Sequence, residues 1–325
     1  MKPFTYVPRP PSRGAALLAA MLTVTLVATF AAAAMWQQWR GIEVETAERA
    51  RVQSAWILVG ALDWSRLILH EDARAGGGDH LAEPWAVPLV EARLSTFLSA
   101  KDGVAQDDAS TDTQDAFLSG AIIDLQSRLN VASLVVAGAI QPGPHTQFAR
   151  LFSQLGLPST ELTALEQALQ RATATELPEG SDAALMPQLV EQLSWLGLPE
   201  SSVARLAPFV TVLPQRTPVN LNTASPEVLL AAIDGLDRAG AETLTSAREG
   251  RPFRTLDDAQ ALLDPALRLQ VADHDVQTSY FEVQGRLRLG DAVVQERSLI
   301  HRSRTRQVST LWRMRSAAPL HSATP

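Results

Sequence analysis

The chain has 325 residues, 46 % of them apolar, which is long enough for two folded units beyond a membrane segment. It carries 28 basic and 35 acidic residues, a net charge of −7, so no general affinity for nucleic acid or acidic lipid is expected. The absence of cysteine excludes disulfides and thiolate chemistry, and the six scattered histidines lack the spacing of a zinc site. Motifs of hydrolases, nucleotide-binding loops and dinucleotide-binding folds are also missing, so a non-enzymatic protein is predicted.

An apolar run at the N-terminus, Ala15 to Trp36, is long enough to cross a bilayer. Basic residues precede it and acidic residues follow it, which predicts a cytoplasmic N-terminus and an exported remainder. Three interpretations are open. The run is a cleaved signal peptide ending near Ala32–Ala34, a simple signal anchor, or a helix that a protease releases on the cytoplasmic side after Arg13-Gly14.

Residues 37 to about 72 continue this run without proline, and their apolar residues recur at helical spacing. The pattern predicts one unbroken helix of more than fifty residues, ~80 Å long at 1.5 Å per residue. Two helices joined near Gly41 are the alternative. Gly76-Gly77-Gly78 is expected to end the helix, and residues 102–115 are expected to form a solvated loop.

Strand patterns flank the middle of the chain. Apolar and polar residues alternate in AIIDLQSRLNV (121–131), in YFEVQGRLRL (280–289) and again from Val308 to Met314. In the last segment Val308, Thr310, Trp312 and Met314 are expected on one face. Together they predict an antiparallel sheet with one wet face, whose other face the long helix covers.

Residues 136–275 are predicted to form an all-helical module inserted into this α+β unit. A weak repeat, GLPSTELTAL, GLPESSVARL and GLDRAGAETL, begins at Gly156, Gly197 and Gly235. Each glycine is expected to cap one helix, and each following leucine to begin the packing of the next. Duplication and convergent capping explain the repeat equally well.

The segment TPVNLNTASPEVLLAAIDGL (217–236) predicts a helix with Thr223 or Ser225 as N-cap and Pro226 in its first turn. It resembles the second half of helix-hairpin-helix or SAM-like modules, some of which bind DNA. Only Gly235 of the usual glycine pair remains. Residues 220–275 have five arginines and no lysine against ten acidic residues, a net of −5, so nucleic acid is not expected as a partner.

Several motifs together resemble the minor pseudopilin K family of the type II secretion system, the general secretion pathway protein K. They run over nearly the whole chain: Arg13-Gly14 before the apolar helix, IIDLQSRLNV (122–131), ARLAPFVTVLP (204–214), TPVNLNTASPEVL (217–229), PFRTLDDA (252–259) and YFEV (280–283). The resemblance implies a pilin-like α+β fold, in which a long N-terminal helix packs on an antiparallel sheet and a large helical domain is inserted.

The resemblance also implies a function. A prepilin peptidase would cut between Gly14 and Ala15, and the mature, methylated protein would cap a periplasmic pseudopilus. Most pilins carry a glutamate at the fifth mature position, which here is Ala19, so this subunit lacks the carboxylate of the axial stack. The implied partners are the I- and J-type minor pseudopilins, the major pseudopilin, the peptidase and the inner membrane. The rival hypothesis is a membrane-tethered periplasmic DNA-uptake protein of the helix-hairpin-helix type.

The predicted organisation is a leader (1–14), a transmembrane segment (15–36), a pilin-like domain (37–135 and 276–316), an inserted domain (136–275) and a tail (317–325). Two motifs supply candidate structural residues: Asp124, Gln126, Arg128 and Asn130 in the strand, and Asn220, Asn222, Thr223, Pro226 and Gly235 in the insertion. Family members can bind calcium. The acidic residues needed are few here, and Asp107, Asp108, Asp112 and Asp115 are the distant candidates for a calcium site.

Overall fold

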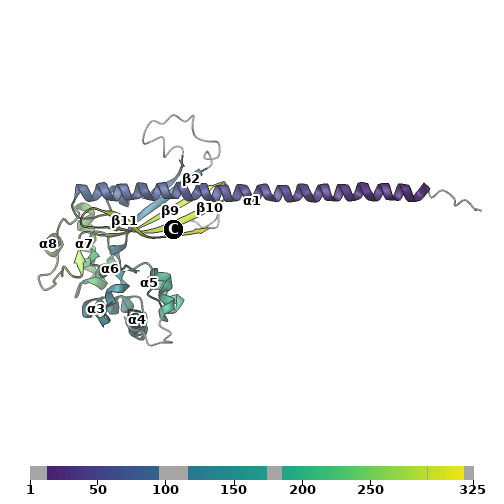
Figure 1. Cartoon of the computed structure of the whole chain (residues 1–325). Helices are drawn as coiled ribbons and strands as arrows, with labels where there is room; N and C mark the ends of the chain where they lie inside the picture. The colour runs from purple at the N-terminus through teal and green to yellow at the C-terminus, as the bar shows by residue number, and fades with distance from the viewer. Residues whose placement is uncertain (1–12, 95–115, 174–184, 291, 318–325) are drawn as a thin grey trace, which may run out of the picture. The chain divides into compact units, whose positions relative to one another are not determined.

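The structure, a computed structural model, describes residues 13–94, 116–173, 185–290 and 292–317 (Figure 1). The chain forms two compact units, Met1–Trp56 and Ile57–Pro325. The second unit contains both the sheet and the inserted helices. The finer domain boundaries stay predictions.

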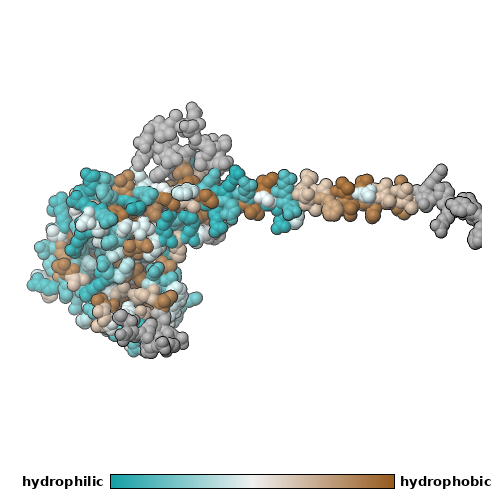
Figure 2. Space-filling view, in the orientation of Figure 1, coloured by the Kyte–Doolittle hydropathy of each residue, from teal (hydrophilic) through white to brown (hydrophobic). Residues whose placement is uncertain are grey.

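Helix α1 runs from Arg13 to Ala75. Gly41 lies inside it, so the alternative of two helices joined there is wrong. In the first unit the large apolar side chains between Leu17 and Met35 are exposed, and Figure 2 shows the apolar surface of this segment in brown. Among the described residues α1 is the one helix long and apolar enough to cross a membrane, as the sequence predicts.

In the second unit the described part of the sheet has five antiparallel strands in the order β1-β2-β9-β10-β11. Their bounds are β1 Leu89–Arg93, β2 Ala116–Asp124, β9 Tyr280–Leu289, β10 Ala292–Arg302 and β11 Val308–Ala317. Strands β2 and β9 are therefore neighbours although the insertion separates them in sequence. This agrees with the predicted pilin-like layout.

The C-terminal part of α1 covers one face of the sheet. Leu62 and Leu69 pack with Phe281 and Ile300, and Trp85 meets Phe281 edge-on at 5.2 Å between ring centroids. Gly285 permits the close approach, because a Cβ there would lie 3.1 Å from Leu58 Cδ2. The helix is therefore held to this face by apolar burial.

The predicted strand 121–131 ends early. Strand β2 stops at Asp124, whose carboxylate accepts a hydrogen bond of 2.7 Å from Gln126 N and starts the 3-10 helix η4, Leu125–Ser127. Asp124, Gln126 and Asn130 were expected on a wet face and are 3 % exposed. The alternation from Leu125 onward therefore marks a buried polar turn.

A β-bulge in β11 overturns a second expectation. Trp312 pairs with Leu299 and Thr310 pairs with Ile300, so Leu311 is the extra residue. Val308 thus packs in the core beneath α1, whereas Trp312 packs with Leu125 and Leu299 on the opposite face. Val308 and Trp312 do not share one face, as a regular strand would require.

The second face of the sheet is not simply wet either. Glu282, expected to face solvent, is 5 % exposed and is held by Arg297, which also reaches Glu191 of the insertion. In Figure 1 the inserted helices lie on the side of the sheet away from α1. Because the insertion covers part of this face, the polar residues of an alternating strand pattern are not all exposed to solvent there.

The insertion has its own large apolar core. Its helices are α3 Pro142–Gln154, α4 Ser159–Ala172, α5 Glu200–Leu206, α6 Pro226–Ala232, α7 Arg238–Gly250 and α8 Leu256–Gln260, with a 3-10 helix η6 at Val190–Leu196. Three pairs of two-residue strands lie in and beside it: β3 Leu129–Asn130 with β6 Val210–Thr211, β4 Val135–Val136 with β5 Ala139–Ile140, and β7 Val219–Asn220 with β8 His274–Asp275. The module is therefore mainly, not wholly, helical.

Two of the three glycines of the repeat lie at a helix end as predicted: Gly156 directly follows the C-cap of α3 and Gly197 is the C-cap of η6, whereas Gly235 lies two residues beyond Ile233, the C-cap of α6. Gly156, Gly197 and Gly235 have φ of 60°, 91° and 73°, and α4, α5 and α7 each begin three residues later. Each following leucine is buried. The repeat thus corresponds to a similar turn between two consecutive helices, whatever its origin.

Candidate functional site: a buried polar junction

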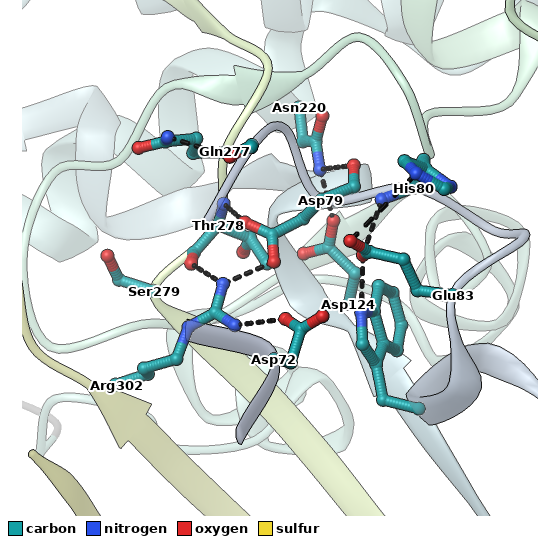
Figure 3. Close-up of polar contacts among 12 residues, drawn as sticks. Asp72, Asp79, His80, Glu83, Asp124, Asn220, Gln277, Thr278, Ser279 and Arg302 are labelled. Atoms are coloured by element: carbon teal, nitrogen blue, oxygen red, sulfur yellow. Dashed lines mark hydrogen bonds and ion pairs between the residues drawn. The ribbon is translucent and has the colours of Figure 1, made fainter. Parts of the chain in front are cut away.

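The two sequence motifs meet at a polar junction between α1, the sheet and the insertion (Figure 3). After Ala75, Gly76 and Gly77 take φ of 68° and 124°, which turns the chain sharply into Asp79. Gly78 has no room for a side chain, because a Cβ would lie 2.5 Å from Phe253 O. The glycine run therefore both ends the helix and seats the next residues against the insertion.

Arg302, the last residue of β10, is the cation of this junction. It forms ion pairs with Asp72 of α1, at 2.6 Å, and with Asp79, and all three side chains are at most 11 % exposed. It also donates to Thr278 O at 3.0 Å, while Asp79 accepts from Thr278 N at 2.7 Å. The end of the helix is thereby tied to the sheet.

Asn220 of β7 ties the insertion to the same place. Its Nδ2 donates to Asp79 O at 3.0 Å and to Asp124 Oδ2 at 2.9 Å, and its Oδ1 accepts from Asn222 N. Thr223 donates to the same carboxylate at 2.6 Å. Asn220 itself is completely buried, so each of these bonds replaces a lost bond to water.

The other motif amides hold the chain where it returns from the insertion. Gln126 donates to Pro218 O at 3.1 Å and accepts from Ser279 N at 2.7 Å. Asn130 donates to Gln215 O at 2.7 Å, and Asn222 exchanges hydrogen bonds of 2.9 Å with the backbone of Phe253. Each amide therefore joins segments that are far apart in sequence.

Burial sets the protonation of the junction. It raises the pKa of Asp124, despite the hydrogen bonds that favour the charged carboxylate. It also raises the pKa of Asp79 to about 6 and that of Glu83 to about 7, with Asp72 and Asp79 adding repulsion at Glu83. The adjacent Arg302 acts in the opposite direction and lowers the pKa of Asp79, because its positive charge favours the ionised carboxylate.

Asp72, Asp79 and Glu83 bring carboxylate oxygens within 4.8 Å of one another, the geometry of a possible metal site. However, Arg302 already neutralises two of them, and Glu83 accepts from His80 N at 2.9 Å and Trp85 Nε1 at 2.7 Å. Calcium needs six to eight oxygens, which this set does not offer. The junction fits a structural connection better than a cation site.

The structure places the remaining candidates elsewhere. Gly14, Ala15 and Ala19 lie exposed in the first turns of α1. Pro226 is the first residue of α6, with Ser225 rather than Thr223 as its N-cap, and Gly235 forms the turn before α7. Arg128 lines a groove away from the junction. The calcium candidates Asp107, Asp108, Asp112 and Asp115 lie outside the described residues.

Sequence reasoning missed Asp72, Asp79 and Arg302. Asp79 directly follows the glycine run, which is a weak signal of a buried polar residue at a forced turn. Arg302 ends a strand of mixed polar and apolar residues, AVVQERSLIHR, and carries no such signal. The three residues meet only because the fold brings the ends of α1 and β10 together.

Comparison with known proteins agrees with this layout. Two family models, both described as type II secretion system protein K, match residues 127–215 and 219–279. A Pseudomonas aeruginosa protein named type II secretion system protein K is 29% identical over 303 residues, which cover 86% of this chain and 85% of that protein. A protein of the same name from Aeromonas hydrophila is 29% identical over 250 residues, covering 66% of this chain and 75% of the relative.

A solved structure has the same fold. It is the crystal structure of the GspK-GspI-GspJ complex from the type 2 secretion system of enterotoxigenic Escherichia coli. The matched chain superposes with a TM-score of 0.64 over 84% of this chain and 99% of that one, at 17% identity. At this identity the likeness establishes the fold.

Proposed function

This chain belongs to the type II secretion system protein K family, and from that premise we propose that it is a minor pseudopilin at the tip of the secretion pseudopilus. There it supports pseudopilus assembly and protein secretion across the outer membrane. The observation that carries the proposal is the shared architecture: a fold that matches, over 84% of this chain, a structure solved as a GspK-GspI-GspJ complex.

The partners follow from the same likeness. We propose that I- and J-type minor pseudopilins are its direct neighbours, and that the major pseudopilin forms the fibre below. A tip position is supported by Ala19, which offers no carboxylate to pair with the amine of a neighbouring subunit inside the apolar bundle. The bulky insertion would also obstruct a further subunit above it.

The apolar part of α1 supports a single-pass anchor in the inner membrane, with the remainder in the periplasm. We propose that the prepilin peptidase cleaves between Gly14 and Ala15 and that α1 stays attached to the rest of the chain. The pair α6–α7, joined by Gly235, supports the helix-hairpin-helix or SAM-like likeness of the insertion. Calcium binding at residues 107–115 stays a prediction.

Complementation with two readouts tests this function. Cells lacking the gene are expected to stop secreting and to regain secretion with the full chain, which should co-purify with the I- and J-type subunits. Intact-mass measurement of the recovered chain should give an N-terminus at Ala15, and Gly14→Leu should abolish both processing and secretion. A mature N-terminus near Met35 would instead indicate an exported periplasmic protein without its helix.

The rival DNA-uptake function is not favoured. The relatives are named as secretion proteins, and the α6–α7 region lies in a stretch with a net charge of −5, from five arginines and ten acidic residues. A gel shift with duplex DNA at low salt is expected to show no complex, because phosphate contacts require basic side chains.

A further inference from the structure

A short strap, residues 76–83, connects the end of α1 to η1 (Pro84–Ala86) and lies against the insertion. Asp79 N donates to Val276 O at 2.9 Å, and Asp79 O accepts from Asn220 Nδ2 at 3.0 Å. Asn220 belongs to β7, and Val276 directly follows β8. The backbone of the strap is therefore fixed where these two short strands run side by side.

The side chains at the strap bring together more negative than positive charge (Figure 3). Asp72 at the end of α1, Asp79 and Glu83 place carboxylate oxygens within 4.8 Å of one another. Among the described residues Arg302 is the permanent cation in contact with this set, through its ion pairs with Asp72 and Asp79. Three ionised carboxylates and one guanidinium leave a net charge of −2, and the buried Asp124 adds repulsion at Asp79. Like charges this close disfavour the ionisation of the whole set.

The other charged groups around the strap do not neutralise this excess. His80 Nε2 lies 3.9 Å from Glu83, but burial lowers the pKa of His80, which favours its neutral form. Arg216 is paired with Asp273 at 2.7 Å. The remaining titratable residues that line the polar groove beside the strap are Asp275, Tyr280, His301, Arg304 and Arg306. In the described part of the chain none of these five is ion-paired with the strap or with Asp72.

Burial shifts the two carboxyls of the strap toward their neutral forms. It raises the pKa of Asp79 to about 6 and that of Glu83 to about 7. In water the same groups titrate near 3.8 and 4.5, so the closed strap holds more protons than a strap that has lifted into solvent. The stabilisation of the closed strap is therefore complete below about pH 4 and is lost as the pH rises through about 7.

We propose that the strap is a pH-sensitive latch, which holds the end of α1 to the insertion when it is protonated and releases it as the pH rises through neutrality. Release breaks the bonds of Asp79 to Asn220 and to Thr278 N. The ion pair of Arg297 with Glu191 remains as a second contact between the sheet and the insertion. The groove of about 680 Å³ beside the strap gives solvent, and hence protons, access to its carboxyls.

Hydrogen–deuterium exchange on the full chain, in detergent micelles with EDTA, tests the latch. Protection factors, the ratio of intrinsic to observed exchange rates, report local opening at each pH. Protection in peptides that cover the strap and residues 276–279 should fall about tenfold or more between pH 5.5 and pH 8, because two carboxyls lose protons. Protection in α3, in the core of the insertion, should change less than about twofold.

Conservative variants separate the latch from a general effect of pH. Glu83→Gln and Asp79→Asn cannot ionise, and each should reduce the pH-dependent loss of protection in the strap by about threefold or more. Glu71→Gln, at an exposed position of α1 beside Asp72, should preserve that loss.

The wild-type measurement decides the question even if Asp79→Asn destabilises the junction. Constant protection of the wild-type strap between the two pH values would overturn the proposal. An equal loss of protection in α3 would overturn it too, in favour of global destabilisation. A loss that Glu83→Gln leaves unchanged would show that the carboxyls of the strap do not control its opening.

Discussion

Single amides at the junction connect segments that no local structure would hold together. Asn220 is fully buried and uses both ends of its side chain, toward Asp79, Asp124 and Asn222. Asn220→Ala would remove the donor to the Asp79 carbonyl and one of the three donors to the buried Asp124 carboxylate, which keeps those of Thr223 and Gln126. We expect it to lower the free energy of unfolding by about 2–4 kcal/mol, measured by denaturant titration in micelles.

The matched control for that change is Gln277→Ala. Gln277 is exposed and makes one hydrogen bond across the same turn, 2.9 Å to Gly77 O, so its loss should cost less than about 1 kcal/mol. A cost for Asn220→Ala no greater than that of the control would show that the junction does not bind the insertion to the sheet.

Glu83 should make stability fall as pH rises. Its carboxyl has a pKa raised by burial to about 7 in the fold, and in the unfolded chain it titrates near 4.5. Between these values the folded state holds the extra proton, so the stabilisation is complete below about 4.5 and is lost as pH rises through about 7. We expect the Tm to drop between pH 5 and pH 8, by roughly 2–4 °C per kcal/mol lost.

Glu83→Gln isolates this contribution. The amide keeps an oxygen to accept from His80 N and Trp85 Nε1 but cannot ionise, so the drop in Tm between pH 5 and pH 8 should shrink. Asp72, Asp79 and Arg302 surround the site in both proteins, which makes the difference between the two curves the informative quantity. Glu200→Gln, at an exposed position of α5, should leave the curve unchanged.

At the scale of elements, the bulge in β11 can be removed without changing which side chains face α1. Deleting Leu311 would join Thr310 and Trp312 in the register they already have opposite Ile300 and Leu299. Leu311 is 45% exposed, so little burial is lost. We expect the free energy of unfolding of the deletion variant, measured by thermal unfolding, to change by no more than about 1–2 kcal/mol.

Deleting Arg313 is the control, because it would move Met314 to the α1 side of the sheet. Glu296, 5 % exposed in its side chain, would lose its bidentate bonds to Arg313 and Arg315. An uncompensated buried charge lowers the free energy of unfolding by about 3–5 kcal/mol, so this variant should unfold at a much lower temperature. Equal losses from the two deletions would contradict the register.

The turn between α6 and α7 gives a further prediction. Gly235 has φ of +73°, and a Cβ there would lie 2.8 Å from Leu267 Cδ2. Gly235→Ala should therefore lower the free energy of unfolding by about 1–3 kcal/mol, measured by thermal unfolding. Gly250→Ala, in open space at the end of α7, should be neutral or slightly stabilising. A neutral Gly235→Ala would show that the left-handed turn is not required.

These elements also show how far sequence reasoning extends. Helix α1, the strand β9 and the glycines at the ends of α3 and η6 follow from periodicity and local backbone preference, and the structure contains them. The bulge at Leu311 and the turn at Asp124 were missed. In both places apolar and polar residues continue to alternate in the sequence although the backbone no longer follows a regular strand. The ion pairs of Arg302 join residues more than 220 positions apart, which no local pattern encodes.

At the scale of the whole molecule, the charges around the apolar part of α1 predict its orientation. Lys2, Arg9 and Arg13 precede it, and Glu43, Glu45 and Glu48 follow it among a few arginines. Basic residues near a span are retained in the cytoplasm, so the C-terminus should lie outside it. Alkaline phosphatase fused to the C-terminus is expected to be active in intact cells at a normal level of fusion protein.

Changing the three glutamates to lysine tests the cause of that orientation. Arg40, Arg49 and Arg51 already follow the span, so three added lysines would place six basic residues after it against three before it. Phosphatase activity per amount of protein should then fall several-fold, whereas the same three positions changed to glutamine should leave it unchanged, because acidic residues contribute little to retention. An abundant but inactive wild-type fusion would contradict a periplasmic location and, with it, a place in a pseudopilus.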